Sequence, residues 1–87
     1  MDHVSKWDIS IDLFEHEDST VARVVLRTRA TVLRAEGRAR RNPVDAPVPE
    51  IGDELAVGRA LADLGAQLMY SAAGDLAAIG GQRHDDN

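Results

Sequence analysis

The chain has 87 residues, a net charge of −5 and 44% hydrophobic residues, which fits one small globular domain and excludes a disordered chain. It has no cysteine, so disulfides and thiolate metal sites are excluded, and no apolar run approaches the roughly 20 residues of a membrane span. The polar N-terminus lacks a signal-peptide pattern, and the overall acidity disfavours non-specific nucleic-acid binding, so we expect a cytoplasmic protein.

Two β-strands are expected first. Residues 7–13 place apolar side chains at every second position, and residues 20–28 do the same after a polar turn at residues 15–19. The short connection predicts an antiparallel hairpin. Its expected register places Leu13 beside Ala22, Ile11 beside Val24, Ile9 beside Leu26, Asp12 against Arg23 and Asp8 against Arg27.

A third strand is expected over residues 33–40, where small or apolar residues alternate with charged ones. Its inner residues are Leu33, Ala35, Gly37 and Ala39, and their small size leaves room for a helix to lie close. The connection at residues 29–31 lacks the Asn-Gly or Asp-Gly of a tight hairpin, so the sequence predicts the strand better than its turn.

A helix is expected after a proline-containing linker that begins near Asn42. Pro43, Pro47 and Pro49 end the sheet, and helical spacing begins near Gly52. The expected helix ends at residues 80–81, which closes a single domain over residues 1–81 and leaves residues 82–87 as a disordered tail. The predicted core stripe is Val57, Leu61, Leu64, Leu68 and Ala72. The fold class is therefore α+β, a three-stranded antiparallel meander packed against one long C-terminal helix (β-β-β-α).

No group of residues predicts catalysis. The histidines, at positions 3, 16 and 84, have no metal-ligand spacing, and neither an activated nucleophile nor a phosphate-binding loop is present. Glu50, Asp53 and Glu54 could hold a divalent ion, but acids at a helix start more often interact with the helix dipole. We expect no enzyme activity, no cofactor, no metal and no small-molecule substrate.

Two surfaces are candidate contact sites. By parity, arginines at positions 23, 27, 29, 34, 38 and 40 share one sheet face, which either meets phosphate or is a solvated face paired with acids. We take Arg23, Arg27, Arg34, Arg38 and Arg40 as the possible partner or RNA contact, without an interleaved aromatic for base stacking. Small residues on the helix indicate either close packing on the sheet or a homodimer contact at Leu55, Gly58, Ala62 and Met69.

Residues 40–64, RRNPVDAPVPEIGDELAVGRALADL, resemble the signature of a family of small actinobacterial proteins, the domain of unknown function 1876 group, and residues 6–29 resemble it too. The resemblance implies a β-β-β-α fold similar to part of the double-stranded-RNA-binding fold. It also implies a link with stress and dormancy, and no catalytic residues. Because the expected helix starts with acids, duplex RNA binding through that helix start is disfavoured. We expect a non-enzymatic homodimeric module, or alternatively a binder of ribosomes or structured RNA.

Overall fold

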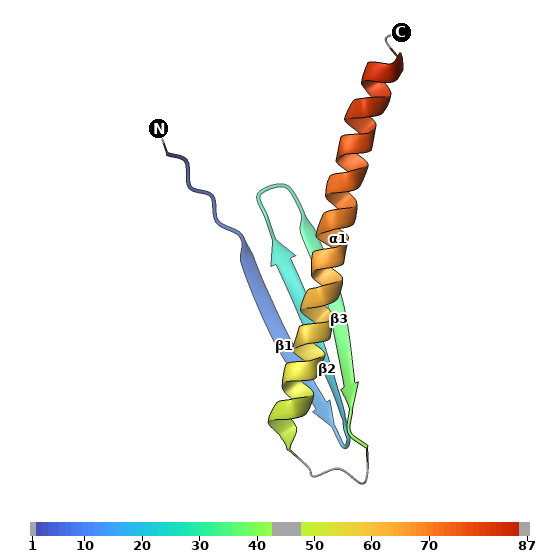
Figure 1. Cartoon of the computed structure of the whole chain (residues 1–87). Helices are drawn as coiled ribbons and strands as arrows, with labels where there is room; N and C mark the ends of the chain where they lie inside the picture. The colour runs from blue at the N-terminus through green and yellow to red at the C-terminus, as the bar shows by residue number, and fades with distance from the viewer. Residues whose placement is uncertain (1, 43–47, 86–87) are drawn as a thin grey trace.

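The chain forms three antiparallel strands followed by one long helix (Figure 1). This computed structural model describes residues 2–42 and 48–85, with side chains described through residue 79. The strands are β1 (Asp8–His16), β2 (Ser19–Arg27) and β3 (Val32–Arg40), paired in the order β1-β2-β3, and the helix is α1 (Pro49–Asp85). The predicted α+β meander with one helix is confirmed.

The first hairpin has the predicted register. All five expected pairs occur between β1 and β2, from Leu13 with Ala22 to Asp8 with Arg27. The two strands extend further toward the turn than expected, because only Glu17 and Asp18 connect them. Glu17 takes the left-handed backbone conformation, with φ of 53°. A two-residue hairpin turn requires such a positive φ to match the twist of its strands.

The second hairpin closes through a threonine. Thr28 donates its backbone N–H to the carbonyl of Thr31 at 2.9 Å. The Thr28 hydroxyl also accepts hydrogen bonds from the N–H groups of Ala30 and Thr31, at 3.2 and 3.0 Å. This side-chain turn replaces the missing Asn-Gly signal, since a hydroxyl can satisfy the amides that a tight hairpin would pair.

Helix α1 begins and ends beyond its expected limits. Pro49 is its first residue, a position where a missing N–H costs nothing. The helix continues through Gly74 and past Gly80 and Gly81, because a glycine ends a helix by taking a positive φ and none of the described glycines does. The expected tail at residues 82–87 therefore falls partly in the helix, to Asp85, and residues 86–87 lie outside the described residues. Most of the expected extended linker, residues 43–47, also lies outside them.

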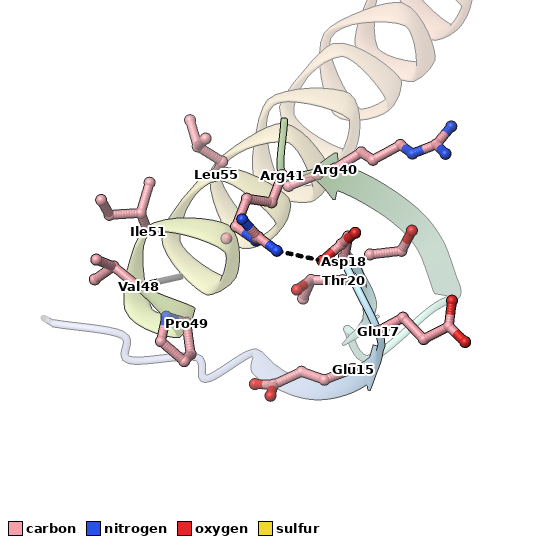
Figure 2. Close-up of a pocket in the computed structure, with 13 residues that line it drawn as sticks. Glu15, Glu17, Asp18, Thr20, Arg40, Arg41, Val48, Pro49, Ile51 and Leu55 are labelled. Carbon is pink, nitrogen blue, oxygen red and sulfur yellow. Dashed lines mark hydrogen bonds and ion pairs between the residues drawn. The ribbon is translucent and has the colours of Figure 1, made fainter. Parts of the chain in front are cut away.

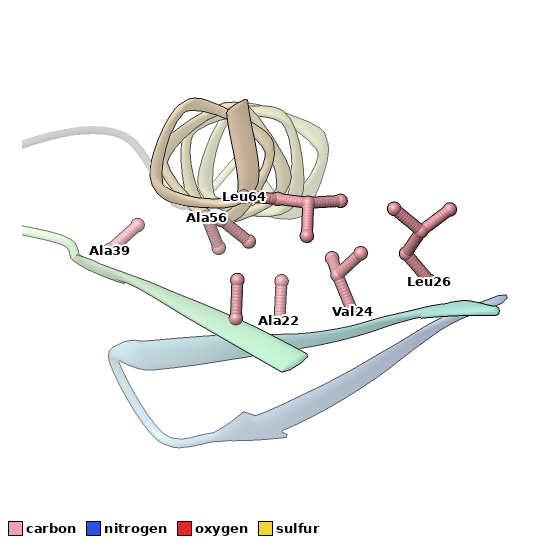
Figure 3. Close-up of a cluster of buried hydrophobic side chains, with 8 residues drawn as sticks. Ala22, Val24, Leu26, Ala39, Ala56 and Leu64 are labelled. Carbon is pink, nitrogen blue, oxygen red and sulfur yellow. The ribbon is translucent and has the colours of Figure 1, made fainter. Parts of the chain in front are cut away.

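The core is a close contact between the helix and the small face of β3. A Cβ on Gly37 would lie 2.1 Å from the Ala56 carbonyl oxygen and 2.4 Å from the Ala60 nitrogen. The helix therefore rests largely on alanines. Of the predicted stripe, Leu64 is buried and Val57 and Leu68 are partly buried against the core. Leu61 and Ala72 are exposed, so the stripe is wrong at these two positions. The buried hydrophobic side chains, shown in Figure 3, are Ala22, Val24, Leu26, Ala35, Ala39, Ala56, Ala60 and Leu64.

Strand β1 is left outside this core. The helix lies along the sheet (Figure 1) and packs on β2 and β3. Every residue of β1 is exposed. The expectation that the whole inner face of the sheet joins the helix in one core is therefore right for β2 and β3 and wrong for β1. One helix, about 10 Å wide, covers the width of about two strands at about 4.8 Å each, and the sheet twist carries the third strand further from it.

Candidate interaction surfaces

The sheet has two unlike faces. We call the face beneath α1 the helix-side face and the opposite one the open face. The core residues of β2 and β3 occupy the helix-side face, so alternation places their arginines on the open face. The predicted arginines at 23, 27, 34, 38 and 40 are thus brought together there, whereas Arg29 lies in the turn at residues 28–31.

The arginines of the open face are only partly paired. Glu36 bridges two of them, with oxygen–nitrogen distances of 3.9 Å to Arg23 and 3.5 Å to Arg38. Asp12 lies opposite Arg23 in the register, yet the ion pair of Arg23 goes to Glu36. Among the side chains of residues 2–42 and 48–79, the arginines that make no ion pair on this face are Arg27, Arg34 and Arg40.

An aromatic side chain does lie on the open face, contrary to the expectation from the sequence. The Arg23 guanidinium lies 4.8 Å from the centre of the Phe14 ring, a cation–π contact. Phe14 pairs with Val21 in the register, so it alternates to the face opposite Leu13. The sequence did contain a signal for this placement, because Phe14 has an even number whereas the apolar residues before it, Trp7 to Leu13, have odd numbers.

An apolar row lies uncovered on the helix-side face. It consists of Trp7, directly before β1, and Ile9, Ile11 and Leu13 of β1. Ile9, Ile11 and Leu13 are 51%, 42% and 42% exposed, although their partners on β2, Leu26, Val24 and Ala22, are at most 2% exposed. The helix-side face is therefore buried along β2 and exposed along the neighbouring strand β1.

The residues predicted as a dimer contact lie on the outer side of α1. Leu55 and Met69 are 47% and 74% exposed, and Gly58 and Ala62 between them are exposed too. A Cβ on Gly58 would meet nothing within 4 Å, so this small-residue side does not pack on the sheet. The alternative of close packing is thereby wrong for Gly58 and Ala62, and the dimer contact stays a prediction.

Charged side chains gather where the helix starts beside the first hairpin turn. A hollow of about 450 Å³ lies there, and Arg41 crosses it to donate a hydrogen bond to Asp18 at 2.7 Å (Figure 2). The pKa of Glu15 is raised above the ordinary 4.5. The main cause is a hydrogen bond to the Asp53 carboxylate, and the next is the negative charge of Asp53. Asp53 is the one acid of the predicted cluster that makes this contact, and no group of three or more metal-ligating side chains occurs in the described part of the chain.

These features define a class: a small α+β protein whose single helix covers two strands of a three-stranded meander and leaves the third exposed. None of the described helices is long and apolar enough to cross a membrane. The arrangement offers surfaces for contact, an arginine face and an apolar row.

The chain belongs to the Rv2632c-like family, whose model matches residues 5–85. The uncharacterized protein Mb1767 of Mycobacterium bovis is 47% identical over 79 residues, which are 90% of this chain and 84% of that protein. The uncharacterized protein Rv2632c of Mycobacterium tuberculosis is 40% identical over 78 residues, 88% of this chain and 84% of that one. The crystal structure of Rv2632c superposes with a TM-score of 0.80 at 39% identity, covering 90% of this chain and 94% of that chain. The fold is therefore shared with a solved member of the family.

Proposed function

We propose that this protein is a non-enzymatic cytoplasmic interaction module that works as a homodimer. The observation that carries the proposal is the apolar row at Trp7, Ile9, Ile11 and Leu13, which continues the buried core outward without a cover. Contiguous apolar surface of this kind on a small domain marks a contact with another protein. The stress or dormancy role that the family resemblance implies would be exercised through such contacts, and a pull-down from stressed cells tests it.

The apolar row supports dimerisation better than the outer side of the helix does. The row is continuous in space, because its residues alternate along one extended strand. On the helix, the large side chains Leu55 and Met69 are fourteen positions apart, about 21 Å along the axis, with Gly58 and Ala62 between them. Both surfaces are accessible, but only the row adjoins the core.

Sedimentation velocity over a range of concentrations tests this proposal. We expect a species of twice the 9.4 kDa monomer mass, dissociating on dilution. Trp7, the only tryptophan, should shift its fluorescence to shorter wavelength as the dimer forms, because it is 53% exposed in the single chain. A monomer at every concentration up to the sub-millimolar range would refute the homodimer.

Structured-RNA or ribosome binding is a second candidate, favoured by the open face. There Arg27, Arg34 and Arg40 make no ion pair within the described residues, and Phe14 offers a ring for stacking. Filter binding across a salt series tests it, because contacts to phosphate weaken steeply as salt rises. Arg34→Glu combined with Arg38→Glu should abolish binding, and an absence of binding at low salt would exclude this candidate.

A further inference from the structure

The two edges of the sheet are treated differently by the helix. On the β3 edge, Arg59 Nη1 donates to the carbonyl of Arg38 and Gln67 Nε2 donates to the carbonyl of Arg34, both at 2.7 Å. These bonds occupy backbone acceptors that another strand would need. On the β1 edge, no side chain within residues 2–42 and 48–79 makes such a bond. The β1 edge is therefore the one available for strand addition.

The register shows which backbone groups β1 presents at this edge. Arg34 and Arg38 point their carbonyls away from β2, so even-numbered residues of β3 face outward. The bond from Thr28 to Thr31 agrees, because it directs even-numbered residues at the end of β2 toward β3. Even-numbered residues of β2 thus bond to β3, and odd-numbered residues of β2 bond to even-numbered residues of β1. The odd-numbered residues of β1 are therefore left with their N–H and C=O groups pointing outward. Ile9, Ile11 and Leu13 therefore combine a free backbone edge with an exposed apolar side chain.

We propose that β1 pairs antiparallel with β1 of a second copy, centred on Ile11, to make one continuous six-stranded sheet. The inference rests on the proposed homodimer and specifies its contact. Ile11 then lies opposite Ile11 of the other copy, and Ile9 lies opposite Leu13. These three hydrogen-bonded pairs exchange about six backbone bonds, two for each pair. Both helices lie on the same face, and the two apolar rows join into one stripe between them.

Charge favours this register over the two centred on the adjacent residues, Ser10 and Asp12, which also keep the apolar residues on one face. Centred on Ile11, Ser10 faces Asp12 and Asp8 faces Phe14, so no like charges are directly opposed. A shift by one position toward Ser10 sets Asp8 against Asp12 twice. A shift toward Asp12 sets that residue against itself and Ile9 against Glu15. Of these three registers, only the one centred on Ile11 avoids opposing like charges directly.

The same pairing explains why association ends at two copies. In the dimer both β1 edges are consumed, and each outer edge is a β3 strand held by Arg59 and Gln67. A two-fold contact of this kind is closed, whereas an open edge would admit further chains. Asp8 and Asp12 of both copies still gather near the centre of the open face, so salt should strengthen the dimer by screening them.

Single cysteines test the pairing, because the chain has none of its own. At a hydrogen-bonded pair the two Cα atoms lie about 5.5 Å apart, within disulfide range, so oxidised Ile11→Cys should become a covalent dimer. Ser10→Cys and Asp12→Cys are matched controls, since in this register each lies more than about 7 Å from its own copy, beyond disulfide reach. Preferential cross-linking at either control, or none at Ile11→Cys while the protein still sediments as a dimer, would overturn the proposed contact and leave the homodimer standing.

Ile11→Pro gives a second, non-covalent measurement. Proline removes an outward N–H there, which an edge strand tolerates, so the far-UV spectrum should stay that of the folded chain. We expect the dimer dissociation constant to rise about 100-fold or more, as for loss of a central contact. A folded Ile11→Pro variant that dimerises as tightly as the parent would overturn the inference. If the parent itself is a monomer at every concentration, the homodimer proposal fails first.

Discussion

Gly37 is the position where the fold is most sensitive to added volume. A methyl group there would lie 2.1 Å from the Ala56 carbonyl oxygen and 2.4 Å from the Ala60 nitrogen, and both are backbone atoms of a helix. Neither atom can rotate away, as the end of a long side chain could. Gly37→Ala therefore requires the helix and β3 to separate by at least 0.9 Å, from 2.1 to 3.0 Å.

The cost of this separation follows from the core that it loosens. A gap of about 1 Å forfeits a quarter to a half of the dispersion energy across the contact, and overpacking a tight core costs about 1–3 kcal/mol. Because the helix contributes Ala56, Ala60 and Leu64 to the core, we place the loss for Gly37→Ala near the top of that range, at about 3 kcal/mol. A domain of this size has only about 4–13 kcal/mol of stability in total.

Chemical and thermal unfolding at one fixed protein concentration measure the effect. Gly37→Ala should lower the melting temperature by more than about 10 °C. Gly65→Ala is the matched control: its Cβ would meet nothing within 4 Å, and alanine in an exposed helix is favoured by up to about 1 kcal/mol, so this variant should be stabilised. A loss below about 1 kcal/mol at Gly37 would refute the reasoning from close contact.

Three further outcomes are expected from other contacts. Protonated Glu15 is favoured in the fold beside Asp53, so stability should fall as pH rises above 4.5, and Glu15→Gln should melt higher than the parent at pH 7 but equally at lower pH. Arg59→Ala removes a hydrogen bond to a β3 carbonyl and should lower the free energy of unfolding in urea by about 1 kcal/mol. Arg59→Ala combined with Gln67→Ala frees two carbonyls at the β3 edge and should produce species larger than dimers in sedimentation. Leu64→Ala should cost about 2–5 kcal/mol, and exposed Leu76→Ala less than about 0.5, by the same unfolding measurement.

The hairpin was predictable because two independent patterns agree on it. Period-two hydrophobicity aligns Ile11 with Val24, and opposite charges place Asp12 across from Arg23. Which residues of the helix face the sheet was less predictable, because a leucine stripe would bury more apolar area than alanines do. Ala56 and Ala60 face the sheet because Gly37 lets their backbone approach it, and this fit depends on residues from two distant segments.

The arginine face followed from parity alone, but the edge at β1 did not. Alternation predicts that Ile9 and Leu13 share a face with Leu26, yet it does not say how many strands one helix can cover. Nor does it show that Arg59 and Gln67 reach over the opposite edge, because that depends on the position of the helix across the sheet. Features set by the relative placement of whole elements are those that single-strand patterns miss.

Helix α1 is one continuous element with two different stabilities. Up to Leu68 it is held by the sheet, but from Met69 to Ile79 every residue is exposed, and the segment contains Gly74. An isolated helical segment of this length is marginal in water, so its turns persist chiefly because the docked part has already nucleated them. Amide exchange should therefore require global unfolding near Ala60 and only local fraying near Leu76. A partner that binds this end would have to order only a few helical turns, and this ordering would lower its affinity without disturbing the sheet.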